Sequence, residues 1–144
     1  MPTIMKQMNA ISRAQSVFRG EALNNGELGG CHHSFVLAIC YNPGMSQEQL
    51  ARHICLNKST VARTLTYLEE KGYVIRRPSE ADKRITLVYP TAKMEEVLPR
   101  VKEVAAEWQS VLVAGEDPEE IKAFAAMLSR MEARAKAFLG GVVE

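Results

Sequence analysis

Apolar residues recur every three or four positions over most of this 144-residue chain, a spacing that predicts amphipathic helices. The first helix is predicted over residues 4–23. Residues 33–41 are apolar on nearly all sides, so periodicity alone cannot distinguish a helix from a buried strand there. Two longer stripes predict helices over about residues 92–114 and 118–139. The pattern therefore indicates a mainly helical protein.

Two short helices are predicted in the middle of the chain. Ser46 and Gln49 have the spacing of a capping box, in which each side chain bonds the backbone N–H of the other. Asn57 interrupts the apolar run and is a favourable N-cap for the second helix, and Gly72 suits the left-handed position beyond its end. The buried face of that helix is predicted from residues at i, i+4 and i+7, which are Val61, Leu65 and Leu68.

The segment after these helices has the pattern of a β-hairpin. Residues 73–75 are β-prone, and residues 85–89 alternate with the period of a half-buried strand, with Ile85, Leu87 and Tyr89 on one face. The polar segment 76–84 between them is interpreted as the hairpin loop. We expect Met45 to add a short strand beside this hairpin.

Capping signals also mark the C-terminal helices. Thr91 is a plausible N-cap for the helix over residues 92–114, and Pro99 inside that helix is expected to kink it because proline removes a backbone donor. Asp117 followed by Pro118 is a strong helix start. Gly140–Gly141 is predicted to end the last helix.

The second short helix has a cationic and hydroxylated outer face, which suits the major groove of DNA. That face carries Lys58, Ser59, Thr60, Arg63, Thr64 and Tyr67. Taken alone, such a face is equally typical of a solvated surface. The polar hairpin loop that follows it favours contact with DNA.

This order of helix, turn, helix, strand, polar loop and strand resembles the winged-helix domain of the MarR family of bacterial transcription regulators. The residues that carry the resemblance are Leu56–Val61, Leu68–Val74, Arg76–Pro78 and Asp82–Arg84, in the order and at the spacing of the family. The family often has Thr-x-x-Gly after the last strand, and here only Thr91 matches. The motifs cover about a third of the chain.

The resemblance implies a mainly α fold with a small β-hairpin wing (α+β), in which residues 33–41 form a helix. We expect a single domain over residues 1–144. It would have a winged helix-turn-helix core at 31–91 and dimerisation helices at 1–30 and 92–144. Because the terminal helices have little of a small core to cover, we expect their stripes to be buried in a two-fold homodimer.

Family positions give the residues expected to bind a pseudo-palindromic double-stranded DNA operator. They are Ser46, Lys58, Ser59, Thr60, Arg63, Thr64, Arg76, Arg77, Lys83 and Arg84. In the family, the arginine at the position of Arg84 reaches into the minor groove. Asp82 is therefore expected to position the wing rather than to contact DNA.

The charge distribution supports this division, although the net charge is only +1. Residues 52–94 carry nine cations and four acids, a net charge of +5, whereas residues 95–144 carry six cations and ten acids, a net charge of −4. A basic middle suits a protein that faces nucleic acid with that segment. The N-terminus has no apolar core of a signal peptide and no apolar run approaches a membrane span, so we expect a cytoplasmic protein without membrane contact.

Family members often respond to small aromatic or phenolic molecules that bind between the dimer helices and the DNA-binding domain. The residues expected to line such an effector pocket here are His32, His33, Phe35 and Tyr41, an apolar run with polar groups at its ends. Cys31, His32 and His33 also allow a second interpretation, a metal- or thiol-sensing regulator. We expect no metal and no cofactor, because further ligands are lacking. Cys40 and Cys55 lie in apolar runs and are predicted to be core residues.

No Gly-rich phosphate loop, nucleophile elbow or carboxylate pair with a partner base is present in the sequence, so we expect no enzyme. The sequence predicts a homodimeric transcription regulator, a repressor relieved by a small effector. The alternative from a different class is a helical dimer that acts through protein partners without binding DNA.

Overall fold

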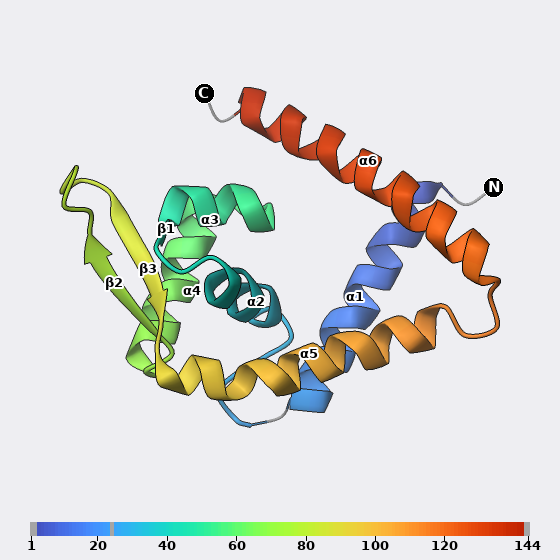
Figure 1. Cartoon of the computed structure of the whole chain (residues 1–144), viewed down its shortest axis with the longest axis horizontal. Coiled ribbons are helices and arrows are strands. Elements are labelled where there is room, and N and C mark those ends of the chain that lie inside the picture. Colours follow the sequence, from blue (N-terminus) through green and yellow to red (C-terminus); the bar gives the residue numbers. More distant parts are fainter. Residues whose placement is uncertain (1–2, 24, 143–144) are drawn as a thin grey trace.

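The computed structural model describes residues 3–23 and 25–142 and is mainly helical with one small sheet, which confirms the predicted fold class (Figure 1). In chain order the elements are α1 (Ile4–Leu23), α2 (His33–Tyr41), β1 (Met45–Ser46), α3 (Gln47–Ile54), α4 (Lys58–Glu70), β2 (Val74–Pro78), β3 (Thr86–Pro90), α5 (Ala92–Leu112) and α6 (Pro118–Val142). Residues 33–41 are helical, as the family resemblance implied.

The core lies between α2, α3, α4, the sheet and the first half of α5. Its fully buried side chains include Phe35, Ile39, Leu50, Val61, Leu65, Leu68, Tyr73, Val88, Met94 and Val101. Burying one large apolar side chain stabilises the fold by about 1.5–3 kcal/mol. This core therefore fixes one face of α4 and leaves its other face at the surface.

The predicted helix starts are confirmed by side-chain hydrogen bonds. Ser46 and Gln49 form both bonds of the capping box, at 3.1 and 3.0 Å. Asn57 accepts from the backbone N–H of Thr60 at 2.8 Å, and Thr91 accepts from that of Met94 at 3.4 Å. Each of these caps satisfies a backbone donor that the helix itself leaves unpaired.

The sheet is antiparallel, in the order β1-β3-β2, and the predicted strand at Met45 pairs with Val88. Two details of the hairpin prediction are wrong. Strand β2 extends to Pro78, so the wing loop is residues 79–85 rather than 76–84. The buried residue of β3 is Val88, whereas Ile85 is 43% exposed. Both faces of β3 carry apolar residues, so alternation alone did not show which face meets the helices.

At the C-terminus, α6 begins where expected, with Asp117 accepting from two backbone N–H groups at 2.9 and 3.2 Å. The predicted end at Gly140–Gly141 is wrong, because the helix continues to Val142. Glycine in a helix costs only about 1 kcal/mol relative to alanine, which near a helix end does not force termination. Helix α5 runs through Pro99 without interruption.

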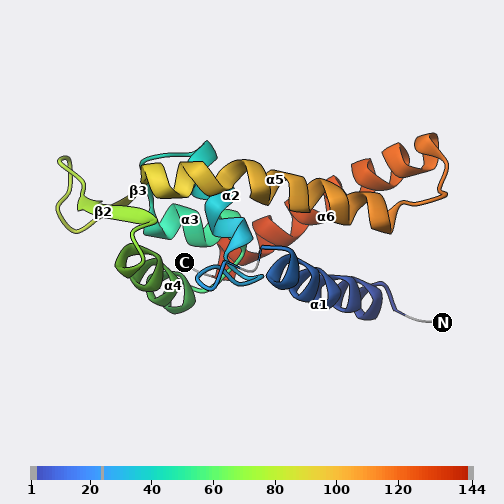
Figure 2. The ribbon, with the colours of Figure 1, turned by 90° about the horizontal axis from the view of Figure 1, so that it is seen from below.

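Helix α1 packs against the middle and second half of α5, which carries the chain away from the core to a far corner where α6 turns back (Figures 1 and 2). Large apolar side chains remain exposed along these three helices. They include Ile4, Met5, Met8, Ile11, Val111, Leu112, Phe124, Met127 and Phe138. None of the described helices has both the length and the apolar character needed to cross a lipid bilayer.

Candidate nucleic-acid interface

Helix α4 has two faces of opposite chemistry. Val61, Leu65 and Leu68 are fully buried, whereas Lys58, Ser59, Arg63 and Thr66 are exposed, and Thr60 and Thr64 lie half-buried at the border. Helix α4 and the wing lie at the same end of the molecule, away from the turn between α5 and α6 (Figure 2). The polar face of α4 is therefore exposed to solvent at the same end of the molecule as the wing.

Local hydrogen bonds order the start of this face. Asn57 accepts from the Ser59 hydroxyl at 2.9 Å, and Arg63 donates to the Thr60 hydroxyl at 3.4 Å. Lys58 lies 3.1 Å from Glu48, and this ion pair lowers the pKa of the Glu48 carboxyl. Exposed pairs of this kind are weak, so Lys58 can exchange its carboxylate for a phosphate.

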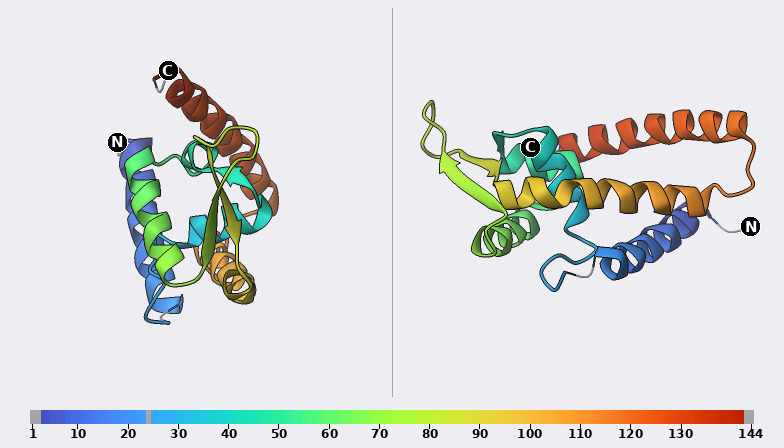
Figure 3. Two further views of the ribbon diagram at one scale, coloured as in Figure 1. Left: turned by 90° about the vertical axis from the view of Figure 1, so that its left-hand side faces the viewer. Right: turned by 60° about the horizontal axis from the view of Figure 1, so that its bottom comes forward.

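The wing projects beyond the rest of the chain, next to α4 (Figure 3). At its tip the Arg84 guanidinium donates to both carboxylate oxygens of Asp82, at 3.0 and 2.9 Å, and holds the pKa of that carboxyl below its usual range. Asp82 also accepts from the backbone N–H of Arg84 at 3.0 Å. The Arg84 side chain is 91% exposed, and Lys83 beside it is exposed as well. Asp82 therefore holds the Arg84 side chain and backbone at the tip of the wing.

The remaining predicted DNA contacts lie in different surroundings. Arg77 is exposed, with its guanidinium 5.8 Å from the centre of the Tyr89 ring. Ser46 is buried, and its hydroxyl serves as the cap of α3. Arg76 is only 22% exposed and is hydrogen-bonded to α3 and α4. Of these three residues, only Arg77 is presented to the solvent.

Tyr67 is not on the outer face of α4, where the helical pattern placed it. Its hydroxyl donates to the backbone carbonyl of Glu27, and its ring stacks on His32 with centroids 5.2 Å apart. The same loop is held by a second tyrosine, because Tyr73 donates to the Glu27 carboxylate at 2.6 Å. Burial, followed by this bond, raises the pKa of Tyr73 to about 12. Lys93 completes the group, 2.9 Å from Glu27.

The four residues expected to line an effector pocket lie in different environments. Phe35 belongs to the core, and Tyr41 is 60% exposed beside a small cavity of about 430 Å³. His32 accepts from the backbone N–H of Gly29 at 2.9 Å. His33 is buried between α2 and α1, where burial and the nearby Arg19 charge lower its pKa to about 4.

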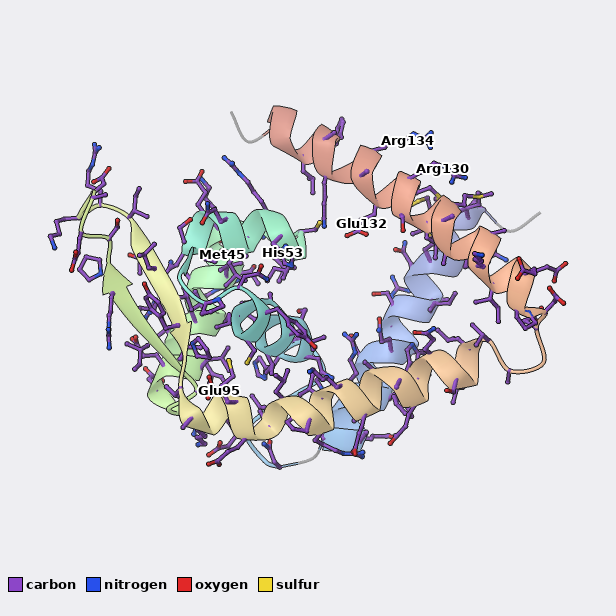
Figure 4. All side chains as sticks on the ribbon, viewed as in Figure 1. Met45, His53, Glu95, Arg130, Glu132 and Arg134 are labelled. Carbon is purple, nitrogen blue, oxygen red and sulfur yellow. The ribbon has the colours of Figure 1, made fainter. Side chains whose placement is uncertain are left out.

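A larger groove of about 1,020 Å³ lies between α3 and the last turns of α6. His53 of α3 and Glu132 of α6 face each other across this region (Figure 4). Cys55 lines the groove and is exposed, so its prediction as a core residue is wrong. It occupies the left-handed C-cap of α3, with φ of 57°, and this turns the side chain outward.

Cys31 is exposed, whereas Cys40 is half-buried, and burial raises the pKa of its thiol. Over residues 3–23 and 25–142, no three His, Cys, Asp or Glu side chains gather in a group that could hold a metal ion.

Comparison with known proteins adds to this geometry. The model of the MarR family matches residues 33–86, which run from α2 to the start of β3. The crystal structure of the transcriptional regulator SlyA superposes with a TM-score of 0.91 at 26% identity, covering 98% of this chain and 99% of SlyA. Residues 33–86 therefore match the MarR family, and the chain resembles these regulators over nearly its whole length.

Two further transcriptional regulators extend the likeness over the terminal helices. YybA, an HTH-type transcriptional regulator of Bacillus subtilis (strain 168), is 28% identical over 131 residues, which are 91% of this chain and 87% of YybA. A MarR-family regulator from Listeria monocytogenes, solved complexed with 26mer DNA, has a TM-score of 0.88. Its sequence is 22% identical, and the superposition covers 95% of this chain and 91% of the Listeria chain. The two proteins therefore share a fold.

The MarR motifs did not indicate the partners of Arg76 or the role of Glu27. Gln47, Thr66 and Glu69, which bind Arg76, are ordinary polar residues on helix surfaces in the sequence. Glu27 lies in a loop forty residues before its partner Tyr67. In the sequence, Glu69 and Glu27 are simply acidic residues, and each could equally well belong to a solvated surface.

Proposed function

We propose that the protein is a homodimeric transcription regulator that binds double-stranded DNA in a sequence-specific way. The observation that carries this proposal is the shared location of Arg63 on the outer face of α4 and Arg84 at the wing tip, both exposed at one end of the molecule. The Listeria relative, which has the same fold, was solved with DNA. In this proposal α4 enters the major groove, and the wing grips the adjacent minor groove.

Selection of random duplexes with the purified protein tests the proposal. We expect enrichment of a pseudo-palindrome whose half-sites are separated by about 10 base pairs, one helical turn, or a multiple of it. A selection that enriches no sequence would contradict specific DNA binding. It would favour a helical dimer that acts through protein partners.

Arg63→Ala is expected to relax base preference at one position in each half-site. An arginine at this place can bond a guanine edge twice, which is worth roughly 1–3 kcal/mol of discrimination. Lys58→Ala should instead weaken all sequences alike and lower the slope of log affinity against log salt by about 1 for each phosphate that it leaves without a cation. Titration of point-substituted operators at two salt concentrations separates the two effects. Unchanged base preference in Arg63→Ala would contradict its role in reading bases.

Arg84→Ala is expected to weaken binding through the bases that flank each half-site, with less preference for A·T pairs there. Arginine in a minor groove responds to groove width and potential, which A·T tracts provide. Arg13→Ala is the matched control, because Arg13 is an exposed cation on α1, far from the wing. Equal losses of affinity in the two variants would indicate only general electrostatic attraction.

The proposed dimer is supported by the surface that a single chain exposes. A compact monomer of 16.0 kDa is expected to expose about 7,400 Å², whereas this chain exposes 9,660 Å². The excess is about 2,300 Å², and most of the exposed large apolar side chains lie on α1, α5 and α6. A two-fold dimer would bury these side chains and carry two copies of α4 to one DNA duplex. Sedimentation at micromolar concentration should therefore give a dimer, and a stable monomer would contradict it.

We also propose that the protein is a repressor that a small aromatic effector releases from DNA. Support comes from the junction of α1, α2 and α5, where Arg19 Nε and Trp108 Nε1 are buried without a hydrogen-bond partner among the described residues, near the buried His33. Each such group costs about 1–3 kcal/mol, so a ligand with acceptor groups would be stabilised there. The Phe18 and Trp108 rings, 5.1 Å apart, add an aromatic wall.

A screen of phenolic ligands tests this second proposal. An effector should raise the melting temperature of the free protein and release operator DNA, because only a ligand with different affinity for the two states shifts their equilibrium. His33→Phe should abolish both effects. If no ligand of the screen produces either effect, the proposal loses its support.

A further inference from the structure

Arg76 differs from the other cations at the DNA-facing end of the molecule. In the sheet it pairs with Val88, which is fully buried, so the two side chains share the inner face of the hairpin. Only 22% of the Arg76 side chain is exposed. The next residue, Arg77, lies on the outer face and is exposed. Two adjacent arginines of one strand thus have different surroundings.

The Arg76 guanidinium joins three separate elements. One terminal nitrogen donates to Gln47 Oε1, in the first turn of α3, at 3.2 Å. The other donates to Thr66 Oγ1 and Glu69 Oε1, both on α4, at 3.2 and 3.0 Å. The backbone N–H of Arg76 donates to the second oxygen of Glu69 at 3.1 Å. We call this set of four bonds the Arg76 clasp.

The clasp uses three of the five guanidinium donors of Arg76 and holds a side chain that is only 22% exposed, whereas Arg84, which is also bonded to a carboxylate, is 91% exposed. Arginine has five N–H donors in a rigid planar fork, and here both terminal nitrogens are already bonded within the chain. Arg76 also holds the pKa of the Glu69 carboxyl below its usual range, so this carboxylate stays charged and bound. The side chain lies against the protein and ties the base of the wing to the C-terminal part of α4.

We infer that Arg76 is a positioning residue, which fixes the wing relative to α4 through Glu69 and does not itself contact DNA. This inference rests on the proposed DNA-binding function. If the clasp loosens, the wing and α4 remain folded but lose their fixed separation. They would then have to become ordered on binding, and affinity would fall.

Glu69→Ala gives the sharpest test, because the two explanations predict opposite signs. Removing an acid from a DNA-facing surface should by itself strengthen attraction to DNA. If the clasp positions the wing, Glu69→Ala instead weakens operator binding, by about fivefold for a coupled pair of this kind. Glu70→Ala is the matched control, since Glu70 is the adjacent exposed acid, and it should leave affinity equal or slightly higher.

Salt dependence separates the roles of the two arginines. Arg76→Ala should lower operator affinity while keeping the slope of log affinity against log salt, whereas Arg77→Ala should lower that slope by about 1 for each phosphate that it no longer neutralises. Arg76→Lys keeps the charge but cannot reach three acceptors at once, so it should behave like Arg76→Ala. The double variant Glu69→Ala/Arg76→Ala should bind the operator no more weakly than whichever single variant binds it less tightly, because both changes break the same clasp.

The inference fails if Glu69→Ala binds as tightly as the wild type while Arg76→Ala reduces the slope as Arg77→Ala does. In that case Arg76 contacts DNA directly. If the wild type binds no DNA, the proposed function fails instead, and thermal unfolding of the same variants still tests the clasp. Non-additive losses of stability at residues 69 and 76 would support it, and additive losses would overturn it.

Discussion

Phe124→Asp is expected to convert the protein to a monomer and to abolish tight operator binding. Phe124 lies on the apolar stripe of α6 and is 59% exposed in the single chain. In a two-fold dimer, the Phe124 side chains of both subunits would be buried at the interface. A central aromatic residue is worth at least about 2 kcal/mol in each copy, so the loss of both should weaken the dimer roughly 1,000-fold. Sedimentation across a concentration series measures this change directly.

Arg130→Asp is the control for an added negative charge on the same helix. Arg130 lies about 120° around α6 from Phe124, on the side that it shares with Arg134 in Figure 4. This variant should remain dimeric and bind its operator. If Phe124→Asp sediments as a dimer at low micromolar concentration, the stripe on α6 is not the dimer interface.

Acid is expected to destabilise the fold through His33. Burial, together with the nearby Arg19 charge, lowers the pKa of His33 from 6.5 to about 4. The unfolded chain therefore takes up a proton at higher pH than the folded chain does. The stability from this difference, about 3 kcal/mol, is complete above pH 6.5 and is lost as pH falls towards 4. About 2 kcal/mol of it should disappear between pH 7 and pH 5.

Urea unfolding at these two pH values, at one fixed protein concentration, measures the loss. His33→Gln cannot titrate, so the difference between its stabilities at pH 7 and pH 5 should be smaller by the same amount. His53→Gln is the control for replacing an exposed histidine. Identical pH dependence in His33→Gln and the wild type would rule out His33 as the source.

Most element boundaries could be predicted because the signals that set them are local. Capping by Ser46, Asn57 and Thr91 depends on residues within three positions, and all three caps are present. Errors arose where local preference is weak. Gly140 does not end α6, and the apolar residues on both faces of β3 left its buried side undetermined.

The candidate site could be predicted only in part. The outer face of α4 follows from its inner face, because Val61, Leu65 and Leu68 fix the helix rotation. The different roles of Arg76 and Arg77 do not follow from their sequence, since they depend on the hairpin register that turns one arginine inward. That register is set by packing against α3 and α4, which sequence spacing does not reveal.

The join between α4 and α5 suggests how a small movement at the dimer could alter DNA binding. Thr91 and Lys93, at the start of α5, donate to the carbonyls of Gly72 and Lys71, just beyond α4, each at 2.7 Å. A helix of 21 residues is about 32 Å long, so with these bonds in place α5 would act as a lever. A tilt of about 5° at its far end would shift α4 by about 3 Å, close to the 3.4 Å rise per nucleotide along one DNA strand. The spacing between the two α4 helices of a dimer would then no longer match the spacing of the DNA half-sites, although α4 itself would be unchanged.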